Sequence, residues 1–402
     1  MRFIYSASTD TGKIEKGTVD AQNATDAAEQ IRRSGLLIVT LRRDRKLQFA
    51  NILGFGWVTN LTKVNFAKHM SLMIRAGLPI DESIRVLRDQ ATGRFRRVLS
   101  DILAAVESGR PLSDGFADHR GIFSDLFIAT IRSGEISGTL EQSLDDLATQ
   151  LVKSYELSRK IRGAMLYPII VIVAALSIGI GLSVFVLPKV IKLFQSITVK
   201  LPLSTQILMN FSNFMVQHGV LAVLGGIAGI FLLNFLFKSK PIRPFTHAFM
   251  LKMPIFGPLI RNYNLAQFSR TMHTLLRSGV SIGEAYKICS DTLHNESYKR
   301  ALLKVRDGIE TGAPSSVVLE ERPKLFPPTA TRMIAVGERT GKLEETYEYL
   351  AQFYEDEVDT ATRNLSTILE PVLLIVIGLG VAFIAISIIL PIYNFIGNIQ
   401  SL

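Results

Sequence analysis

The strongest candidate for chemistry in this chain is a short glycine-rich segment that occurs twice. Gly337-Glu-Arg-Thr-Gly-Lys-Leu-Glu344 repeats the pattern of Gly134-Glu-Ile-Ser-Gly-Thr-Leu-Glu141. A phosphate loop needs four residues between its glycines, and a Ser or Thr after its Lys to hold magnesium. Here three residues separate the glycines, Leu343 follows Lys342, and the earlier copy has no lysine. We therefore interpret both copies as turns between helices. Nucleotide hydrolysis that depends on Lys342 would favour an enzyme instead.

Histidine and cysteine give no alternative chemistry. The six histidines form no His-x₃-His or His-Glu-x-x-His pair, which are the spacings that bind zinc on a helix. The single cysteine, Cys289, excludes a disulfide within the chain and a multi-cysteine metal site. The sequence therefore predicts no catalytic residues, no cofactor and no nucleic-acid partner, and it leaves any metal ligands unknown.

The repeated acidic residues leave two interpretations open. Glu135 recurs as Glu338, and Glu141 recurs as Glu344. Carboxylates at a turn commonly cap a helix or form a local salt bridge. They are also suited to a partner contact or to a cation site with oxygen ligands.

A second motif shows that the duplication extends well beyond this turn. Phe66 to Glu82 aligns with Phe268 to Glu284, and both copies contain Arg-x-Gly-x-x-Ile-x-Glu. The candidate partner-contact or turn residues from both motifs are Arg75, Gly77, Glu82, Gly134, Glu135, Gly138, Glu141, Arg277, Gly279, Glu284, Gly337, Glu338, Gly341 and Glu344.

The elements that position these motifs include three apolar runs. Hydrophobic residues make up 48% of the chain, and they are concentrated at 169–187, 219–237 and 371–390 without a charged residue. Each run has the length that a helix needs to cross a bilayer. Pro168 precedes the first run and Pro371 opens the third, so the repeat continues into the membrane. Two tandem units with both domains on one side need one further crossing, which the middle run supplies.

The flanking charges predict the orientation of these spans. Lys and Arg gather before the first span and after the second, whereas the opposite side has Lys189, Lys192 and Lys200. Basic residues mark the cytoplasmic side of a membrane protein. We therefore predict a cytoplasmic N-terminus, a periplasmic C-terminus and no cleaved signal peptide.

The predicted fold is an all-α membrane protein with two duplicated cytoplasmic six-helix bundles, three transmembrane helices and a small α+β N-terminal segment. Apolar residues at helical spacing, broken by Gly-Leu-Pro and Gly-Arg-Pro, indicate the bundles, and strand patterns at 3–7 and 36–41 flank a helix near the N-terminus. The predicted order is an α+β segment at 1–45, a linker at 46–60, a bundle at 61–168, a span at 169–187, a periplasmic loop at 188–218, a span at 219–237, a bundle at 238–370, a span at 371–390 and a periplasmic tail at 391–402.

The order of these features resembles one family. The two repeated motifs, the span led by Pro168, and Val186-Leu-Pro followed by Leu201-Pro-Leu-Ser-Thr are similar to the inner-membrane platform protein of type II secretion and type IV pilus systems (general secretion pathway protein F, or pilus assembly protein C). The resemblance covers nearly the whole chain. It implies a homo-oligomer in the bacterial inner membrane, working with a cytoplasmic assembly ATPase, pilin-like subunits, other assembly proteins and the lipid bilayer. It also implies a calcium ion in the first bundle, without ligands that can be placed here.

The main alternative is a small-solute transporter. Transporters generally carry ionisable residues or broken helices at the membrane midplane, and the three predicted spans have no charged residue. Solute uptake into vesicles that contain this protein alone would favour the transporter.

Overall fold

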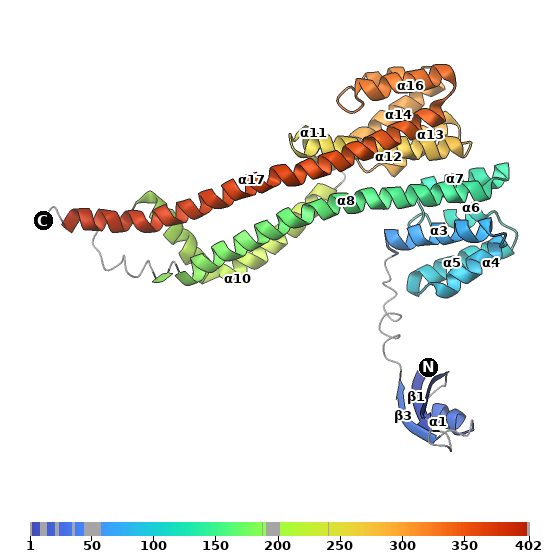
Figure 1. The fold of residues 1–402 in the computed structure, drawn as a ribbon, viewed down its shortest axis with the longest axis horizontal. Helices are drawn as coiled ribbons and strands as arrows, with labels where there is room; N and C mark the ends of the chain where they lie inside the picture. Colours follow the sequence, from blue (N-terminus) through green and yellow to red (C-terminus); the bar gives the residue numbers. More distant parts are fainter. Residues whose placement is uncertain are drawn as a thin grey trace. The chain divides into compact units, whose positions relative to one another are not determined.

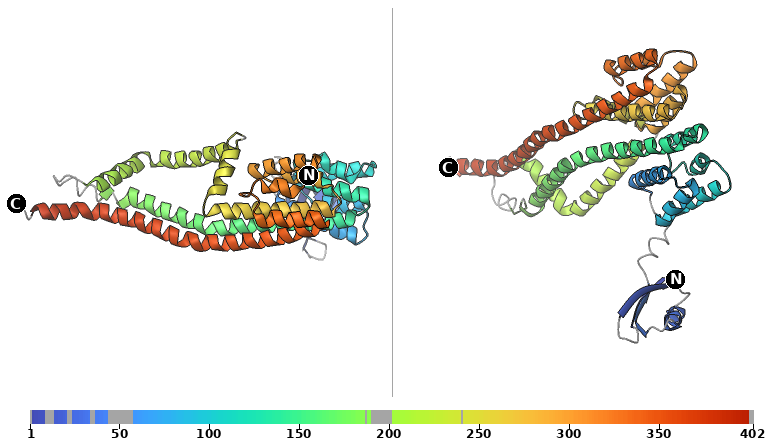
Figure 2. Two further views of the ribbon diagram at one scale, coloured as in Figure 1. Left: turned by 90° about the horizontal axis from the view of Figure 1, so that it is seen from above. Right: turned by 45° about the vertical axis from the view of Figure 1, so that its right-hand side comes forward.

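The structure is a computed structural model that describes residues 2–8, 14–20, 24–33, 37–43, 58–186, 188–189, 202–239 and 241–399. It divides into two compact units, residues 1–122 and 123–402. Figures 1 and 2 show the helices and strands of both units.

The N-terminal part of the first unit is a small sheet beside one helix. Its strands pair antiparallel in the order β2-β1-β3. The sequence patterns anticipate β1, β3 and the helix but not β2, in which Gly17 interrupts the alternation of side chains. The bounds are β1 Arg2–Ser8, β2 Ile14–Asp20, α1 Ala24–Arg33 and β3 Leu37–Arg43. Apart from residues 58–60, the predicted linker at 46–60 lies outside the described residues.

The described part of the first unit also contains four helices after the sheet. Thr59 starts the first of them, because its side-chain oxygen accepts a hydrogen bond from the Thr62 N–H at 3.2 Å. Phe66 lies at the centre of their core, and the rings of Phe95 and Phe116 pack edge-on against it. The helices are α3 Asn60–Arg75, α4 Ile80–Gln90, α5 Gly93–Glu107 and α6 Leu112–Ala117.

The second unit holds the other helices that the structure describes. The last helix of the first repeat runs into the first predicted span and ends in a short π-helical stretch, η1. The bounds are α7 Asp125–Ser137, α8 Leu140–Gly181, η1 Leu182–Val186, α10 Leu203–Lys238, α11 Arg243–Lys252, α12 Phe256–Arg277, α13 Ile282–Thr292, α14 Glu296–Glu310, α15 Ser315–Glu320, α16 Pro328–Thr340 and α17 Leu343–Ile399.

The duplication is visible in the order of the helices. Six helices, α3 to α8, are followed later by six counterparts, α12 to α17, in the same order. The boundary between the compact units falls inside the first repeat, so α3–α6 and α7–α8 belong to different units. The single bundle at 61–168 therefore stays a prediction.

The second repeat packs around Phe268. The rings of Phe326 and Tyr347 meet it edge-on, with centroids 5.6 and 5.5 Å away. The Tyr286 hydroxyl donates to Ser315 Oγ at 2.9 Å and lies 2.6 Å from the Tyr347 hydroxyl. Burial raises the pKa of both phenols, although the hydrogen bonds that Tyr286 makes with Ser315 and Tyr347 oppose the shift of its pKa. This core thus contains a satisfied polar cluster.

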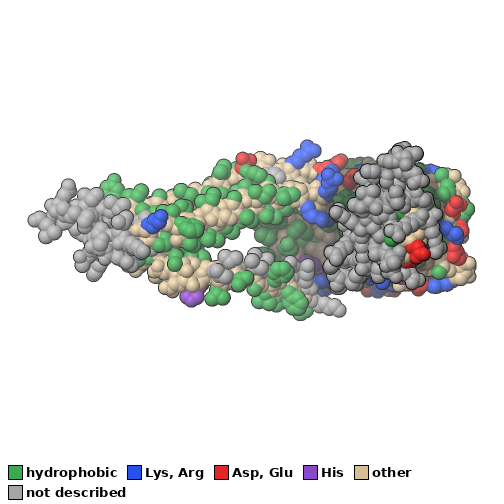
Figure 3. Space-filling model, turned by 90° about the horizontal axis from the view of Figure 1, so that it is seen from below, with side chains coloured by type: hydrophobic (Ala, Val, Ile, Leu, Met, Phe, Trp, Pro, Cys, Tyr) green, Lys and Arg blue, Asp and Glu red, His purple; other side chains and the backbone are tan. Residues whose placement is uncertain are grey.

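Two of the described helices are long and apolar enough to cross a membrane, over Leu140–Val186 and Leu343–Leu390. Hardly any residues of their apolar stretches are buried, and Figure 3 shows hydrophobic side chains covering this part of the molecule. Both helices pass through their prolines, Pro168 and Pro371, without ending. The helix α17 also continues beyond Leu390 into the predicted tail.

The predicted middle span lies in α10, which starts well before it. Residues 203–218, inside the predicted loop, are helical. A kink at His218, where φ is −125° and ψ is 17°, separates this first part from the apolar run that begins at Gly219. The Thr205 hydroxyl donates to the Ser387 carbonyl at 2.7 Å and ties α10 to α17.

Candidate functional site

The second copy of the glycine-rich segment forms a tight corner between α16 and α17. Gly341 ends α16 with a left-handed φ of 71°, a conformation that favours glycine. Gly337 is buried against the start of α17, and a Cβ placed there would lie 2.5 Å from Thr346 Oγ1. One glycine thus permits the reversal of the chain and the other permits close helix contact.

Glu338, inside this corner, caps a neighbouring helix. Its carboxylate accepts hydrogen bonds from the Ser315 N–H at 2.6 Å, the Ser316 N–H at 3.2 Å and the Ser316 hydroxyl at 2.5 Å. Burial raises the pKa of Glu338, but these hydrogen bonds outweigh it, so the pKa lies below its ordinary value. In the second copy, therefore, the structure supports the capping interpretation of this acidic residue.

The first copy has the same backbone geometry. Gly138 ends α7 with a φ of 71°, and a Cβ on Gly134 would lie 2.6 Å from Ser143 Oγ. Glu141 and Glu344 occupy the first turns of α8 and α17 and are exposed. Carboxylates in a first turn favour the helix dipole. Glu135 is half-buried on α7.

The Arg-x-Gly-x-x-Ile-x-Glu motif forms a second, looser turn in each repeat. Gly77 and Gly279 have φ values of 85° and 81° just beyond α3 and α12. Glu82 and Glu284 lie in the first turns of α4 and α13 and are exposed. Arg75 ends α3.

Arg277, the counterpart of Arg75, pairs across the second unit with α8. Its Nε lies 3.1 Å from Asp146 Oδ2. Burial raises the pKa of Asp146, and the positive charge of Arg277 opposes that shift. The pair stands at the end of a longer polar contact between α8 and α12.

Three side-chain pairs form this contact, which we call the polar ladder. Gln150 donates to Thr271 at 3.3 Å, Gln267 donates to Ser154 at 3.0 Å, and the hydroxyls of Ser158 and Tyr263 lie 3.3 Å apart. Positions advance by four along α8 and fall by four along α12, so the helices run antiparallel with one pair per turn.

The polar ladder is flanked by further contacts in the second unit. The Ser133 hydroxyl on α7 donates to the Ser278 carbonyl, and Lys160 on α8 pairs with Asp359 on α17 at 2.6 Å. Leu126 and Leu157 join the apolar core of the second repeat. The last two helices of the first repeat thus dock on the second repeat. The predictions from sequence did not include this contact, although the spacing of Gln150, Ser154 and Ser158 is a detectable signal of a polar stripe on α8.

Within the described residues, the lysine of the glycine-rich segment, a serine motif and the cysteine lie in surroundings that do not suit catalysis. Lys342 lies 3.3 Å from Glu345 Oε2 and is exposed. Gly279-Val-Ser-Ile-Gly283 has the spacing of a serine nucleophile elbow, but that motif needs a strand that leads into a helix, and here α12 leads into α13. Cys289 is fully buried, and burial raises the pKa of its thiol.

The acidic residues are dispersed over the described part of the chain rather than gathered at one point. Within the described ranges, no group of three or more His, Cys, Asp or Glu side chains could hold a metal ion. The described residues therefore give no ligand set for the calcium ion that the resemblance implies.

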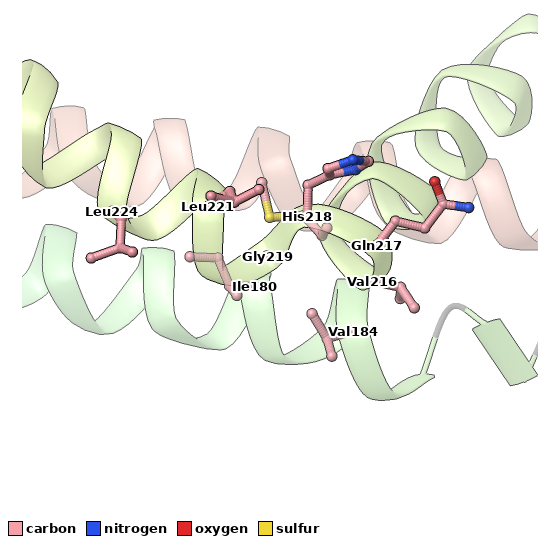
Figure 4. A pocket seen from close by; sticks show the side chains of 9 residues that line it. Ile180, Val184, Val216, Gln217, His218, Gly219, Leu221 and Leu224 are labelled. Carbon is pink, nitrogen blue, oxygen red and sulfur yellow. The ribbon is translucent and has the colours of Figure 1, made fainter.

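A hollow between the long helices is apolar. A groove of about 540 Å³ lies between α8, η1 and α10, with Ile180 and Val184 on one side and Leu221 and Leu224 on the other (Figure 4). His218 borders it at the kink and stacks on Phe214. Its lining suits apolar contact rather than catalysis.

Comparison with known proteins finds one family whose model matches both repeats. The model of the family described as type II secretion system (T2SS), protein F matches residues 66–188 and again residues 268–391, and the N-terminal domain of that protein matches residues 1–42. Type IV pilus assembly protein PilC of Myxococcus xanthus is 33% identical over 402 residues, which cover 99% of this chain and 96% of that protein. PilC of Thermus thermophilus is 32% identical, with 99% of each chain covered. Type II secretion system protein F of Pseudomonas aeruginosa is 29% identical, with 98% of each covered. The chain therefore belongs to the type II secretion system protein F family.

Proposed function

We propose that this chain is the inner-membrane platform of a type IV pilus or type II secretion machine. In this role it couples a cytoplasmic assembly ATPase to the polymerisation of pilin-like subunits. Relatives named for pilus assembly and for type II secretion both match nearly its full length. The chain itself serves as a mechanical part and not as an enzyme.

The observation that carries the proposal is the continuity of α8 and α17. Each starts at a glycine corner and runs without a break into an apolar stretch. A helix rises about 1.5 Å per residue, so the 42 residues of α8 make a rod of roughly 60 Å. Displacement of the bundled end of such a rod is transmitted to its apolar end.

The membrane arrangement belongs to the same proposal. The apolar part of α10 is the third span beside those of α8 and α17, and the charge distribution in the sequence supports both bundles on the cytoplasmic side. The platform is a homo-oligomer that recruits pilin-like subunits and other inner-membrane assembly proteins.

Deletion of the gene tests the role. The deletion strain is expected to make pilin-like subunits and insert them in the inner membrane, but to assemble no pilus or pseudopilus. Expression of the chain from a plasmid restores assembly. Normal assembly in the deletion strain contradicts the proposal.

A second experiment tests the mechanical coupling through α17. Seven Gly and Ser residues inserted after Ser366, between the bundle and the apolar stretch, interrupt the rod. Seven helix-forming residues at the same place add about two turns and preserve its continuity. The flexible insertion is expected to abolish assembly while the helical insertion retains it, at equal levels of membrane-inserted protein. Equal assembly by both variants contradicts coupling through α17.

A further inference from the structure

The short helix α11 has an exposed aromatic face that no part of the described second unit covers. Phe245 and Phe249, one turn apart, are 79% and 67% exposed, and Met250 beside them is also exposed. Large apolar side chains grouped on one helix face mark an interaction site more strongly than scattered ones.

The opposite face of α11 is fixed to the bundle. His247 Nδ1 accepts a hydrogen bond from the Glu296 N–H at 3.1 Å, and Leu251 packs against the core. A Cβ on Gly257 would lie 2.6 Å from the Leu251 carbonyl oxygen, so the glycine lets α12 begin close to the end of α11. The phenylalanines therefore point outward because the fold holds α11 in one orientation.

Charge identifies the kind of surface that this face suits. Arg243 and Lys252 lie at the two ends of α11, and Lys238 and Lys240 precede it. No acidic residue occurs in the sequence between Glu156 and Glu284. A helix with aromatic residues on one face and basic residues around it is typical of segments that lie in a membrane interface.

The position of α11 agrees with such a role. It follows α10 after a turn in which the Arg243 N–H donates to the Ser239 carbonyl at 3.1 Å. Figure 2 shows α11, in yellow, running across the direction of the long helices rather than along it. If α10 crosses the membrane, α11 starts at its boundary and lies along its surface.

We propose that α11 is an interfacial helix whose Phe245–Phe249 face inserts among anionic lipids and holds the second bundle against the membrane. This inference rests on the proposed function, because it requires α10 to be a span. Phe245 and Phe249 enter the acyl boundary, and Arg243 and Lys252 contact lipid phosphates.

Spin labels on the full-length chain in lipid nanodiscs test this proposal. Phe249→Cys carries the label on α11, Val317→Cys on α15 gives an aqueous reference, and Leu379→Cys in α17 gives a membrane reference, because both reference side chains are exposed. Cys289 stays in place because it is buried, and labelling of the unmodified chain measures its background. Relaxation by oxygen and by a water-soluble nickel chelate reports the depth of each label.

In anionic nanodiscs, the ratio of oxygen to nickel accessibility at position 249 is expected to exceed that at position 317 several-fold and to lie below that at 379. The ratio at position 249 should fall in zwitterionic lipids, and it should also fall when Arg243→Gln and Lys252→Gln are combined. A ratio at 249 equal to that at 317, with 379 in the membrane, overturns the role of α11 alone. Spin–spin broadening of the label at position 249, together with an accessibility ratio no higher than at position 317, also overturns the role of α11. In that case a second copy of the chain covers the Phe245–Phe249 face. An aqueous signal at 379 overturns the proposed membrane insertion together with this inference.

Discussion

The two repeats build the same corners from the same glycines, but they fill their cores differently. In the second repeat Tyr286, Tyr298 and Tyr347 are buried, and their hydroxyls are hydrogen-bonded. The residues at the matching positions of the first repeat are Ile84, Phe95 and Leu144. Backbone turns thus stayed constant between the copies, while three buried hydroxyls distinguish one from the other.

This difference separates what the fold needs from what one copy adds. Glycine is favoured where φ is positive or a Cβ would collide, and four such glycines of the first copy recur in the second: Gly77, Gly109, Gly134 and Gly138 correspond to Gly279, Gly312, Gly337 and Gly341. Most buried hydroxyls in proteins are hydrogen-bonded, and Ser315 and the Leu325 carbonyl supply partners for the buried tyrosines of the second repeat. The second repeat therefore adds buried, hydrogen-bonded hydroxyls to a core that both repeats otherwise build from apolar side chains.

The largest predicted effect tests the part that both repeats share. Phe268→Ala and Phe66→Ala each remove a buried central ring and should each lower stability by about 3–5 kcal/mol. Because the rings belong to different compact units, each variant should increase hydrogen exchange mainly in its own unit. Equal loss of protection in both units after either change would contradict independent cores.

The close glycine contact gives the next largest effect. Gly337→Ala should destabilise the corner by about 1–3 kcal/mol, because its Cβ would meet the Thr346 side chain. Thr346→Ala in the same chain should recover most of the loss, and Gly134→Ala with Ser143→Ala should behave alike. The measurement is thermal unfolding of the two single glycine variants and the two double variants. No recovery in the double variants would show that the contact is not the cause.

The tyrosine cluster should make only the second repeat sensitive to loss of one hydroxyl. Tyr286→Phe leaves the Tyr347 hydroxyl and Ser315 without this partner and should destabilise by about 1–2 kcal/mol. Ile84→Val, at the matching position in the first repeat, is a control for loss of apolar volume. Tyr286→Phe combined with Tyr347→Phe should cost less than the two separate losses together, as hydrogen exchange around α13 would report.

High pH should lower the stability of the second repeat, which contains the buried tyrosines, more than that of the first. Burial raises the pKa of Tyr286 and Tyr347 above that of an unfolded tyrosine, near 10, so their neutral forms favour the folded state. This contribution is complete below pH 10 and is lost as pH rises toward the folded pKa. Denaturant titrations at pH 9 and 11 should therefore show a loss in the second repeat that Tyr286→Phe with Tyr347→Phe reduces.

Removal of the Glu338 charge should have a smaller effect. Glu338→Gln weakens the cap on α15 and should destabilise by about 1 kcal/mol near neutral pH. Since the folded pKa lies below the ordinary value, the contribution is present above that value and disappears as pH falls through the folded pKa. Glu345→Gln, at an exposed surface pair, is the control. An equal effect of both changes at pH 7 would contradict the capping role.

Sequence patterns anticipated the helices better than the contacts between them. Gly77 and Gly138 mark helix ends because local geometry demands glycine there, and such demands are visible in sequence. The partners of Glu338 could not be predicted, because Ser315 and Ser316 approach it only after the chain folds back. Spacing could reveal a polar stripe on α8, but not that α12 faces it.

In the polar ladder, the paired substitution of Gln150 and Thr271 gives the smallest predicted change in stability and the sharpest test of that point. Gln150 and Thr271 are both buried, and Gln150 Oε1 has no hydrogen-bond partner among the described residues. Gln150→Leu alone removes the donor to the Thr271 hydroxyl, and the loss of that bond should destabilise by about 1 kcal/mol. Gln150→Leu with Thr271→Val replaces the pair by apolar groups of similar size and should return stability to within about 1 kcal/mol of the unmodified chain. If pilus or pseudopilus assembly in cells falls in the double variant although its stability is unchanged, the polar pair serves the movement of α8 against α12 rather than the attachment of α8 to α12. Normal assembly would show that attachment is its whole role.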